Sequence, residues 1–144
     1  MADDPHDLRR FTDAQDGAFE TALAELRAGA KQSHWMWFVF PQLAGLGHSP
    51  TAQYYAIRSL AEARAYLAHP LLGPRLRQCT EALLPHADDR SAEAIFGSVD
   101  ALKLPSSLTL FDLVAPDDVF ARALDSFFAG EPDQRTLALI GRAR

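Results

Sequence analysis

The chain of 144 residues contains a single cysteine, Cys79. A disulfide within the chain is therefore excluded, and the lack of a second cysteine argues against a structural zinc site. Cys79 lies at helical spacing from Leu76 and Leu83. We therefore predict a thiol buried on the inner face of a helix, with a reactive nucleophile as the alternative interpretation.

Long apolar runs and clusters of basic residues are also lacking. The longest unbroken apolar stretch, Trp35 to Phe40, covers six residues, against the ~20 that a membrane-spanning helix needs. The 14 lysines and arginines are scattered, and 19 acidic residues bring the net charge to −5. This balance argues against nucleic acid and anionic membranes as partners. The opening sequence MADDPHDLRR has no apolar core typical of a secretory signal, so we expect a cytoplasmic location.

Valine and isoleucine supply only seven residues, whereas alanine and leucine supply 45. This balance favours helix and predicts an all-α fold. Cap residues and glycine or proline breakers divide the chain into about eight or nine short helices. We expect a flexible N-terminus over residues 1–6 and a compact single helical domain over residues 7–144. The predicted helix caps are Ser33, Ser49, Ser59 with Glu62 as a capping box, Ser91 and Asp117, and the predicted ends include Gly29, Gly97 and Gly130.

Residues 31–55, KQSHWMWFVFPQLAGLGHSPTAQYY, hold both tryptophans and two of the five histidines. The six-residue apolar run fits either a strand or a helix, but no second convincing strand exists to pair with it. We therefore predict a helix over residues 34–40 that is apolar all round and buried. Its aromatic side chains could form the wall of a ligand pocket or the centre of the core, and the core is the favoured interpretation. On such a helix Trp35 and Trp37 point about 200° apart, so the two cannot both line one wall, although one of them could face a pocket. Each indole N–H is expected to find a backbone carbonyl or a partner such as Gln42.

The polar residues around this segment form the first candidate site. A glycine-containing loop leads into a helix capped by Ser49, and free backbone N–H groups at a helix start attract anions. The alternative is a tight interhelical turn whose glycines supply positive φ. The two histidines lie fourteen residues apart, which is no recognised metal-ligand spacing, so no metal is expected. The candidate ligand-binding residues are Lys31, His34, Trp37, Gln42, His48, Ser49 and Tyr54.

A second polar cluster follows at Lys103, Ser106 and Thr109. One interpretation makes the serines of this stretch helix caps after Pro105, with Lys103 on the surface. The other is a Ser-Lys nucleophile pair, although the companion motifs of such enzymes are absent. If Lys31 and Lys103 both reached the His48 loop, an anionic ligand would gain support.

Three stretches of the chain resemble one known family. They are SHWMWFVFPQLAGLGHS, SLAEARAYLAHPLLGPRLRQCTEALL and the run from Ile95 through LKLPSSLTLF. They are similar to the bacterial and fungal domain of unknown function 1810 (DUF1810), whose members are often labelled calpastatin by automatic transfer. That label does not fit, because calpastatins are long disordered inhibitors. The resemblance implies an all-helical single domain distantly similar to armadillo-type helix stacking, with no established activity, substrate, cofactor or functional residue.

These observations leave three functional hypotheses. The first is a small helical module that binds a small anionic or aromatic ligand near residues 31–55. The second is a protein-interaction scaffold of armadillo-like stacked helices, which predicts an exposed apolar groove outside that segment. The third is an enzyme that uses His34 or His48 as general base, although no catalytic motif is recognised. The partner is then a small molecule or a protein, no cofactor is expected, and the oligomeric state stays open.

Overall fold

The computed structural model describes residues 4–143, with side chains through residue 141. Within this range the chain is all-α and forms no strand. It has ten α-helices and two short 3-10 helices, slightly more than the predicted number, and none of them is long and apolar enough to cross a membrane. The elements are α1 (Arg9–Gln15), α2 (Ala18–Ala28), α3 (Met36–Val39), α4 (Pro50–Tyr54), α5 (Leu60–Ala68), α6 (Leu72–Leu83), η1 (Leu84–His86), α7 (Ala92–Phe96), η2 (Asp100–Leu102), α8 (Leu104–Val114), α9 (Val119–Phe128) and α10 (Gln134–Ala143).

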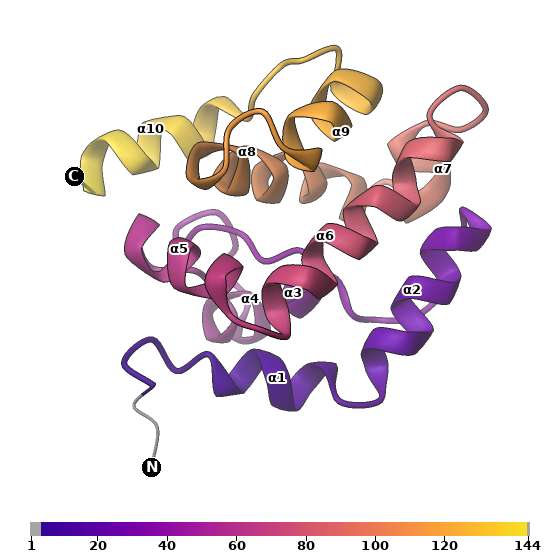
Figure 1. Cartoon of the computed structure of the whole chain (residues 1–144). Helices are drawn as coiled ribbons and strands as arrows, with labels where there is room; N and C mark the ends of the chain where they lie inside the picture. The colour runs from indigo at the N-terminus through magenta and orange to yellow at the C-terminus, as the bar shows by residue number, and fades with distance from the viewer. Residues whose placement is uncertain (1–3, 144) are drawn as a thin grey trace.

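Helix α6 runs through the middle of the molecule and packs against α2, α5 and α9 (Figure 1). Helix α8 packs against α5, α9 and α10 on the other side of the core. Burial of each large apolar side chain between these layers contributes about 1.5–3 kcal/mol. The largest buried side chains are Trp35, Tyr66, Phe11, Phe40, Phe111 and Phe120. Cys79 is also fully buried, and burial raises the pKa of its thiol to about 12, so the predicted buried helix thiol is confirmed.

Most of the predicted helix caps are confirmed. The hydroxyls of Ser49, Ser59 and Ser91 each accept a hydrogen bond from the backbone N–H three residues later. The predicted cap Asp117 is wrong by one residue. Asp117 has a left-handed backbone with φ of 61°, and the extended residue Asp118 instead accepts the Val119 N–H at 2.6 Å. Asp117 and Asp118 are neighbours and both suit an N-cap, so residue type alone does not show which of them caps α9.

The buried helix predicted over residues 34–40 is wrong in extent. Only α3 is helical, a single turn that follows Trp35, and Pro41 comes soon after its end. Ser33 does not cap it. Its backbone N–H and hydroxyl both donate to the carboxylate of Glu25, which holds the preceding loop out of the helix. Trp37 and Phe38 are only half-buried, so this helix is not buried on every side as predicted.

A short backbone pairing places the loop that follows α3. The Ala44 N–H donates to the Ile57 carbonyl at 2.7 Å, and the Ile57 N–H donates to the Gln42 carbonyl at 2.8 Å. These bonds form an isolated bridge between Leu43 and Ile57, both of which are buried. The segment between them, which contains α4, is therefore closed at its base and held at a defined place on the core.

A buried ion pair joins α1 to α5. Arg10 Nη2 lies 2.6 Å from Glu62 Oε2, and both side chains are almost fully buried. Arg10 also donates to the carbonyls of Tyr54 and Ala56, each at 2.9 Å. Removal of one partner of such a pair costs about 3–5 kcal/mol, because the other charge stays buried. The Ser59 cap forms as predicted, but the Glu62 carboxylate serves Arg10 and the Arg58 N–H (3.3 Å) instead of closing a capping box.

The residues before α1 are hydrogen-bonded to the start of this helix. Residues 1–3 of the predicted flexible stretch 1–6 lie outside the described residues. Asp4 accepts hydrogen bonds from the backbone N–H groups of Leu8 and Arg9, at 2.8 and 3.0 Å. These backbone hydrogen bonds lower the pKa of the Asp4 carboxyl. The Asp4 side chain therefore satisfies two backbone N–H groups at the start of α1.

Candidate functional site

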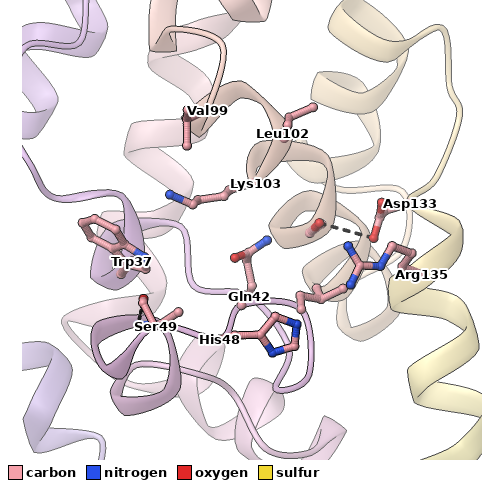
Figure 2. A pocket seen from close by; sticks show the side chains of 13 residues that line it. Trp37, Gln42, His48, Ser49, Val99, Leu102, Lys103, Asp133 and Arg135 are labelled. Atoms are coloured by element: carbon pink, nitrogen blue, oxygen red, sulfur yellow. Dashed lines mark hydrogen bonds between the residues drawn. The ribbon is translucent and has the colours of Figure 1, made fainter.

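A pocket of about 540 Å³ lies beside Trp37 (Figure 2). This volume falls in the range of small-molecule sites. Four parts of the chain build it: α3, the loop that runs from Gln42 into α4, the turn around η2 that continues into α8, and the start of α10. The residues around it are Trp37, Gln42, Leu46, Gly47, His48, Ser49, Ala52, Val99, Leu102, Lys103, Ser106, Asp133 and Arg135.

Two glycines shape the loop wall of the pocket. Gly45 has φ of 102°, which other residues rarely adopt, and a Cβ there would lie 3.3 Å from a methyl group of Leu139 on α10. At Gly47 a Cβ would lie 2.6 Å from the Cβ of Ala52, too close for any real contact. Glycine is therefore required at both positions for different reasons, the first mainly conformational and the second steric. The loop rests against both α4 and α10.

Glu25 fixes the loop before α3 and the Trp35 indole through hydrogen bonds. Its Oε1 accepts the backbone N–H groups of Gln32 and Ser33 and the indole N–H of Trp35, the last at 3.0 Å. Its Oε2 accepts the Ser33 hydroxyl at 2.6 Å. The Trp35 indole therefore has a side-chain partner, as one of the two predicted alternatives allowed, but this partner is Glu25 and not Gln42. Burial acts to raise the pKa of Glu25, but the hydrogen bonds from Ser33, Gln32 and Trp35 outweigh it and hold the pKa at about 2.

Lys31 and Lys103 share one carboxylate behind the pocket. Asp100 Oδ2 lies 2.9 Å from Lys31 Nζ, and Asp100 Oδ1 lies 2.9 Å from Lys103 Nζ. The exposed side-chain fractions are only 6%, 19% and 20% for Lys31, Asp100 and Lys103. Each ammonium also lies over an indole, Lys31 over Trp35 at 4.8 Å and Lys103 over Trp37 at 4.5 Å from the ring centroid. Burial acts to raise the pKa of Asp100, but the two lysines lower it overall.

The second predicted cluster serves the start of α10. Asp133, the residue before this helix, accepts hydrogen bonds from the Ser106 hydroxyl at 3.2 Å and from the Thr136 N–H at 3.0 Å. The Thr136 hydroxyl bonds the same oxygen, and Thr109 Oγ1 accepts the Asp133 N–H at 2.8 Å. Ser106 and Thr109 thus dock the last helix onto α8. Lys103 turns away from them toward Trp37, so no hydrogen bond among the described residues joins it to Ser106.

The structure brings together some of the sequence-predicted site residues and not others. Lys31 reaches the pocket only through Asp100. His34 and Tyr54 are exposed and lie outside the pocket lining, and the Tyr54 carbonyl instead serves Arg10. The predicted residues that do line one pocket are Trp37, Gln42, His48, Ser49, Lys103 and Ser106.

Several pocket residues were missed from the sequence. Asp133 and Arg135 lie in the polar stretch EPDQR before the last helix, where an Asp following a proline was an available cap signal. Val99 and Leu102 are 67% and 75% exposed, although both are large and apolar. Their place in a short turn gave no periodic pattern that would single them out. No group of three or more histidine, cysteine or acidic side chains within the described part of the chain is arranged to hold a metal ion.

Comparison with known proteins gives a family but no activity. The family model described as "Protein of unknown function (DUF1810)" matches residues 5–140. The crystal structure of the conserved hypothetical protein Rv1873 from Mycobacterium tuberculosis is similar, with 51% sequence identity and a TM-score of 0.92. That match covers 96% of this chain and 99% of the other. No curated protein matches the chain. The all-helical architecture, the SHWMWFVFPQ segment and this match over nearly the whole length agree, and the chain belongs to the DUF1810 family.

Proposed function

We propose that this protein binds a small organic anion in the pocket beside Trp37. The observation that carries the proposal is a local excess of positive charge. Lys103 and Arg135 line the pocket against the single carboxylate of Asp133, while Lys31 forms an ion pair with Asp100 next to Lys103. The chain as a whole carries −5. A cationic pocket in an acidic protein attracts anionic ligands and disfavours cationic ones.

The rest of the lining suits an organic ligand better than a bare inorganic ion. Trp37, Val99 and Leu102 give the pocket an apolar side, and Gln42 and His48 add groups that donate or accept hydrogen bonds. A pocket that combines apolar side chains with polar groups that fix the orientation of a ligand is typical of small-molecule sites. Trp37 forms the wall of the pocket, while Trp35 stays in the core.

The scaffold and enzyme hypotheses have less support. A scaffold predicts an exposed apolar groove away from residues 31–55, yet the two most exposed large apolar side chains, Val99 and Leu102, edge this pocket. For catalysis, His48 is the better placed of the two histidines, because it lines the pocket and His34 does not. Within the described residues, no side chain hydrogen-bonds either imidazole to orient it as a base. Binding is therefore the function we propose.

Isothermal titration calorimetry with 3-phenylpropionate and inorganic phosphate tests this proposal. We expect saturable binding of the organic carboxylate to the wild-type protein and a clear loss in Arg135→Gln, since a charge-assisted hydrogen bond contributes about 1.5–3 kcal/mol. Arg64→Gln is the matched control, because Arg64 is exposed on α5 and lies outside the pocket. Equal binding by Arg135→Gln and Arg64→Gln, or no binding by the wild type, overturns the proposal.

A further inference from the structure

The start of α10 presents two opposite charges to the pocket that do not pair with each other. Asp133 and Arg135 both line it, and no ion pair joins them. Figure 2 shows them on the same side of the pocket, with Trp37 on the opposite side. Within residues 4–141, the Arg135 guanidinium has no ion pair or hydrogen bond. A carboxylate and a guanidinium are therefore both available at one end of the same cavity.

The Asp133 carboxylate is held in place by the protein. One oxygen, Oδ2, accepts hydrogen bonds from Ser106 Oγ, Thr136 N and Thr136 Oγ1. The other oxygen, Oδ1, has no hydrogen-bond partner among the described residues. An anchored carboxylate with one free oxygen suits a donor that carries positive charge, because charge-assisted hydrogen bonds are the strong ones. An ammonium group is such a donor.

The side of the pocket opposite Asp133 and Arg135 is unsuited to a second ammonium. Trp37 lies on that side, and Val99 and Leu102 add further apolar lining to the pocket (Figure 2). The Lys103 ammonium already occupies one face of Trp37, 4.5 Å from the ring centroid, and repels a second cation there. Its own charge is matched by Asp100 at 2.9 Å. A ligand with a charged head and an apolar tail therefore has one orientation, with the tail toward Trp37.

We propose that the ligand is the zwitterion of an α-amino acid with an apolar or aromatic side chain. Its carboxylate pairs with Arg135, its ammonium donates to Asp133 Oδ1, and its side chain lies along Trp37, Val99 and Leu102. Gln42, which Figure 2 places between the two ends, is a donor and acceptor for the head group. This inference rests on the proposed anion-binding function and adds to it the second, positive charge of the ligand.

Calorimetry with three related compounds tests the inference. L-Phenylalanine carries both charges, 3-phenylpropionate lacks the ammonium, and 2-phenylethylamine lacks the carboxylate. We expect phenylalanine to bind about tenfold more tightly than 3-phenylpropionate, the factor that one additional charged hydrogen bond supplies. We expect 2-phenylethylamine to bind most weakly, since Lys103 and Arg135 repel its ammonium group. Serine, a zwitterion without an apolar side chain, is expected to bind more weakly than phenylalanine.

The variant Asp133→Asn separates recognition from folding. Asparagine is as good an N-cap as aspartate, so α10 keeps its start while the negative charge is removed. We expect this variant to lose about tenfold in affinity for phenylalanine and to bind 3-phenylpropionate at least as tightly as the wild type does, because a negative charge beside the anion is removed. Asp88→Asn, at an exposed position outside this pocket, is the control and is expected to bind as the wild type does. An unchanged melting temperature and circular dichroism spectrum show that each variant is folded.

The possible outcomes separate this inference from the function on which it rests. If 3-phenylpropionate binds as tightly as phenylalanine, the zwitterion inference is overturned while anion binding stands. If Asp133→Asn weakens both compounds equally, the role of Asp133 as the ammonium partner is overturned. Serine binding equal to that of phenylalanine contradicts the apolar end. If none of the compounds binds, both the inference and the proposed function fail.

Discussion

Trp35 and Trp37 stand two residues apart and have opposite surroundings. Trp35 is buried, its indole N–H is bonded to Glu25, and its ring packs near Phe40 and Phe96 with centroids 6.3 Å away in each case. Trp37 is half-buried, its indole N–H has no hydrogen bond within the described structure, and its ring borders the pocket. A lysine ammonium lies over each ring, Lys31 over Trp35 and Lys103 over Trp37.

The comparison teaches that residue type alone does not decide between a core and a site. Both tryptophans belong to the same short apolar run, and both bring the same large surface. What differs is the completeness of their polar contacts. The Trp35 environment leaves no polar atom of that ring unsatisfied, whereas the Trp37 environment leaves an indole N–H available to a ligand.

The largest expected effect is on stability at Trp35. Trp35→Ala is expected to lower the free energy of unfolding by about 3–5 kcal/mol, because a fully buried aromatic ring is replaced by a cavity. Trp37→Ala is expected to cost much less stability and to abolish binding of 3-phenylpropionate. Urea denaturation followed by circular dichroism, with calorimetry on the folded variant, measures both. Equal losses of stability at the two positions would show that the two environments do not differ as described.

The next largest effect on stability is expected at Glu25, which accepts the hydrogen bond of the Trp35 indole N–H. Glu25→Gln is expected to lower the free energy of unfolding by about 1–3 kcal/mol at neutral pH, because a neutral amide cannot accept all four hydrogen bonds. Glu81→Gln, at an exposed position on α6, is the control and is expected to stay within about 0.5 kcal/mol of the wild type. A Glu25→Gln protein as stable as this control would mean that the carboxylate does not organise the 31–35 loop.

The smallest expected effect is the pH dependence that Glu25 contributes. Its pKa is about 2 in the folded protein, below the ordinary value of 4.5. The unfolded state therefore binds the proton more readily, and the stabilisation is complete above pH 4.5 and lost as the pH falls toward 2. Over this interval the stability difference between the wild type and Glu25→Gln is expected to shrink. Urea midpoints measured at several pH values check this, and a constant difference would contradict the assigned role.

Local features of the fold were predictable from the sequence because their physics is local. Ser49, Ser59 and Ser91 cap helices through bonds to residues three positions later, and the scarcity of β-branched residues excluded a sheet. Helix α3 was predicted too long because its start depends on a distant group. Glu25, on another helix, captures the N–H groups that precede it. No pattern within residues 31–40 contains that information.

The candidate site was predictable on one side only. Trp37, Gln42 and His48 belong to one continuous stretch with unusual composition, and helical spacing predicted that Trp35 and Trp37 do not share one wall. Asp133 and Arg135 come from the other end of the chain. They reach the pocket because α10 docks on α8 through Thr109 and Ser106, and such a long-range pairing of short helices leaves no periodic signal in sequence.

The carboxylate of Asp100 makes the core and the pocket thermodynamically dependent on each other. It binds the lysine that covers Trp35 and the lysine that covers Trp37, at 2.9 Å in each case. A change in charge at either lysine alters the field felt by the other through this shared group, so their contributions are not additive. If the charge of Lys103 were removed, Asp100 would keep only Lys31 as its ion-pair partner, so a change on the pocket side is expected to alter the ion pair beside Trp35.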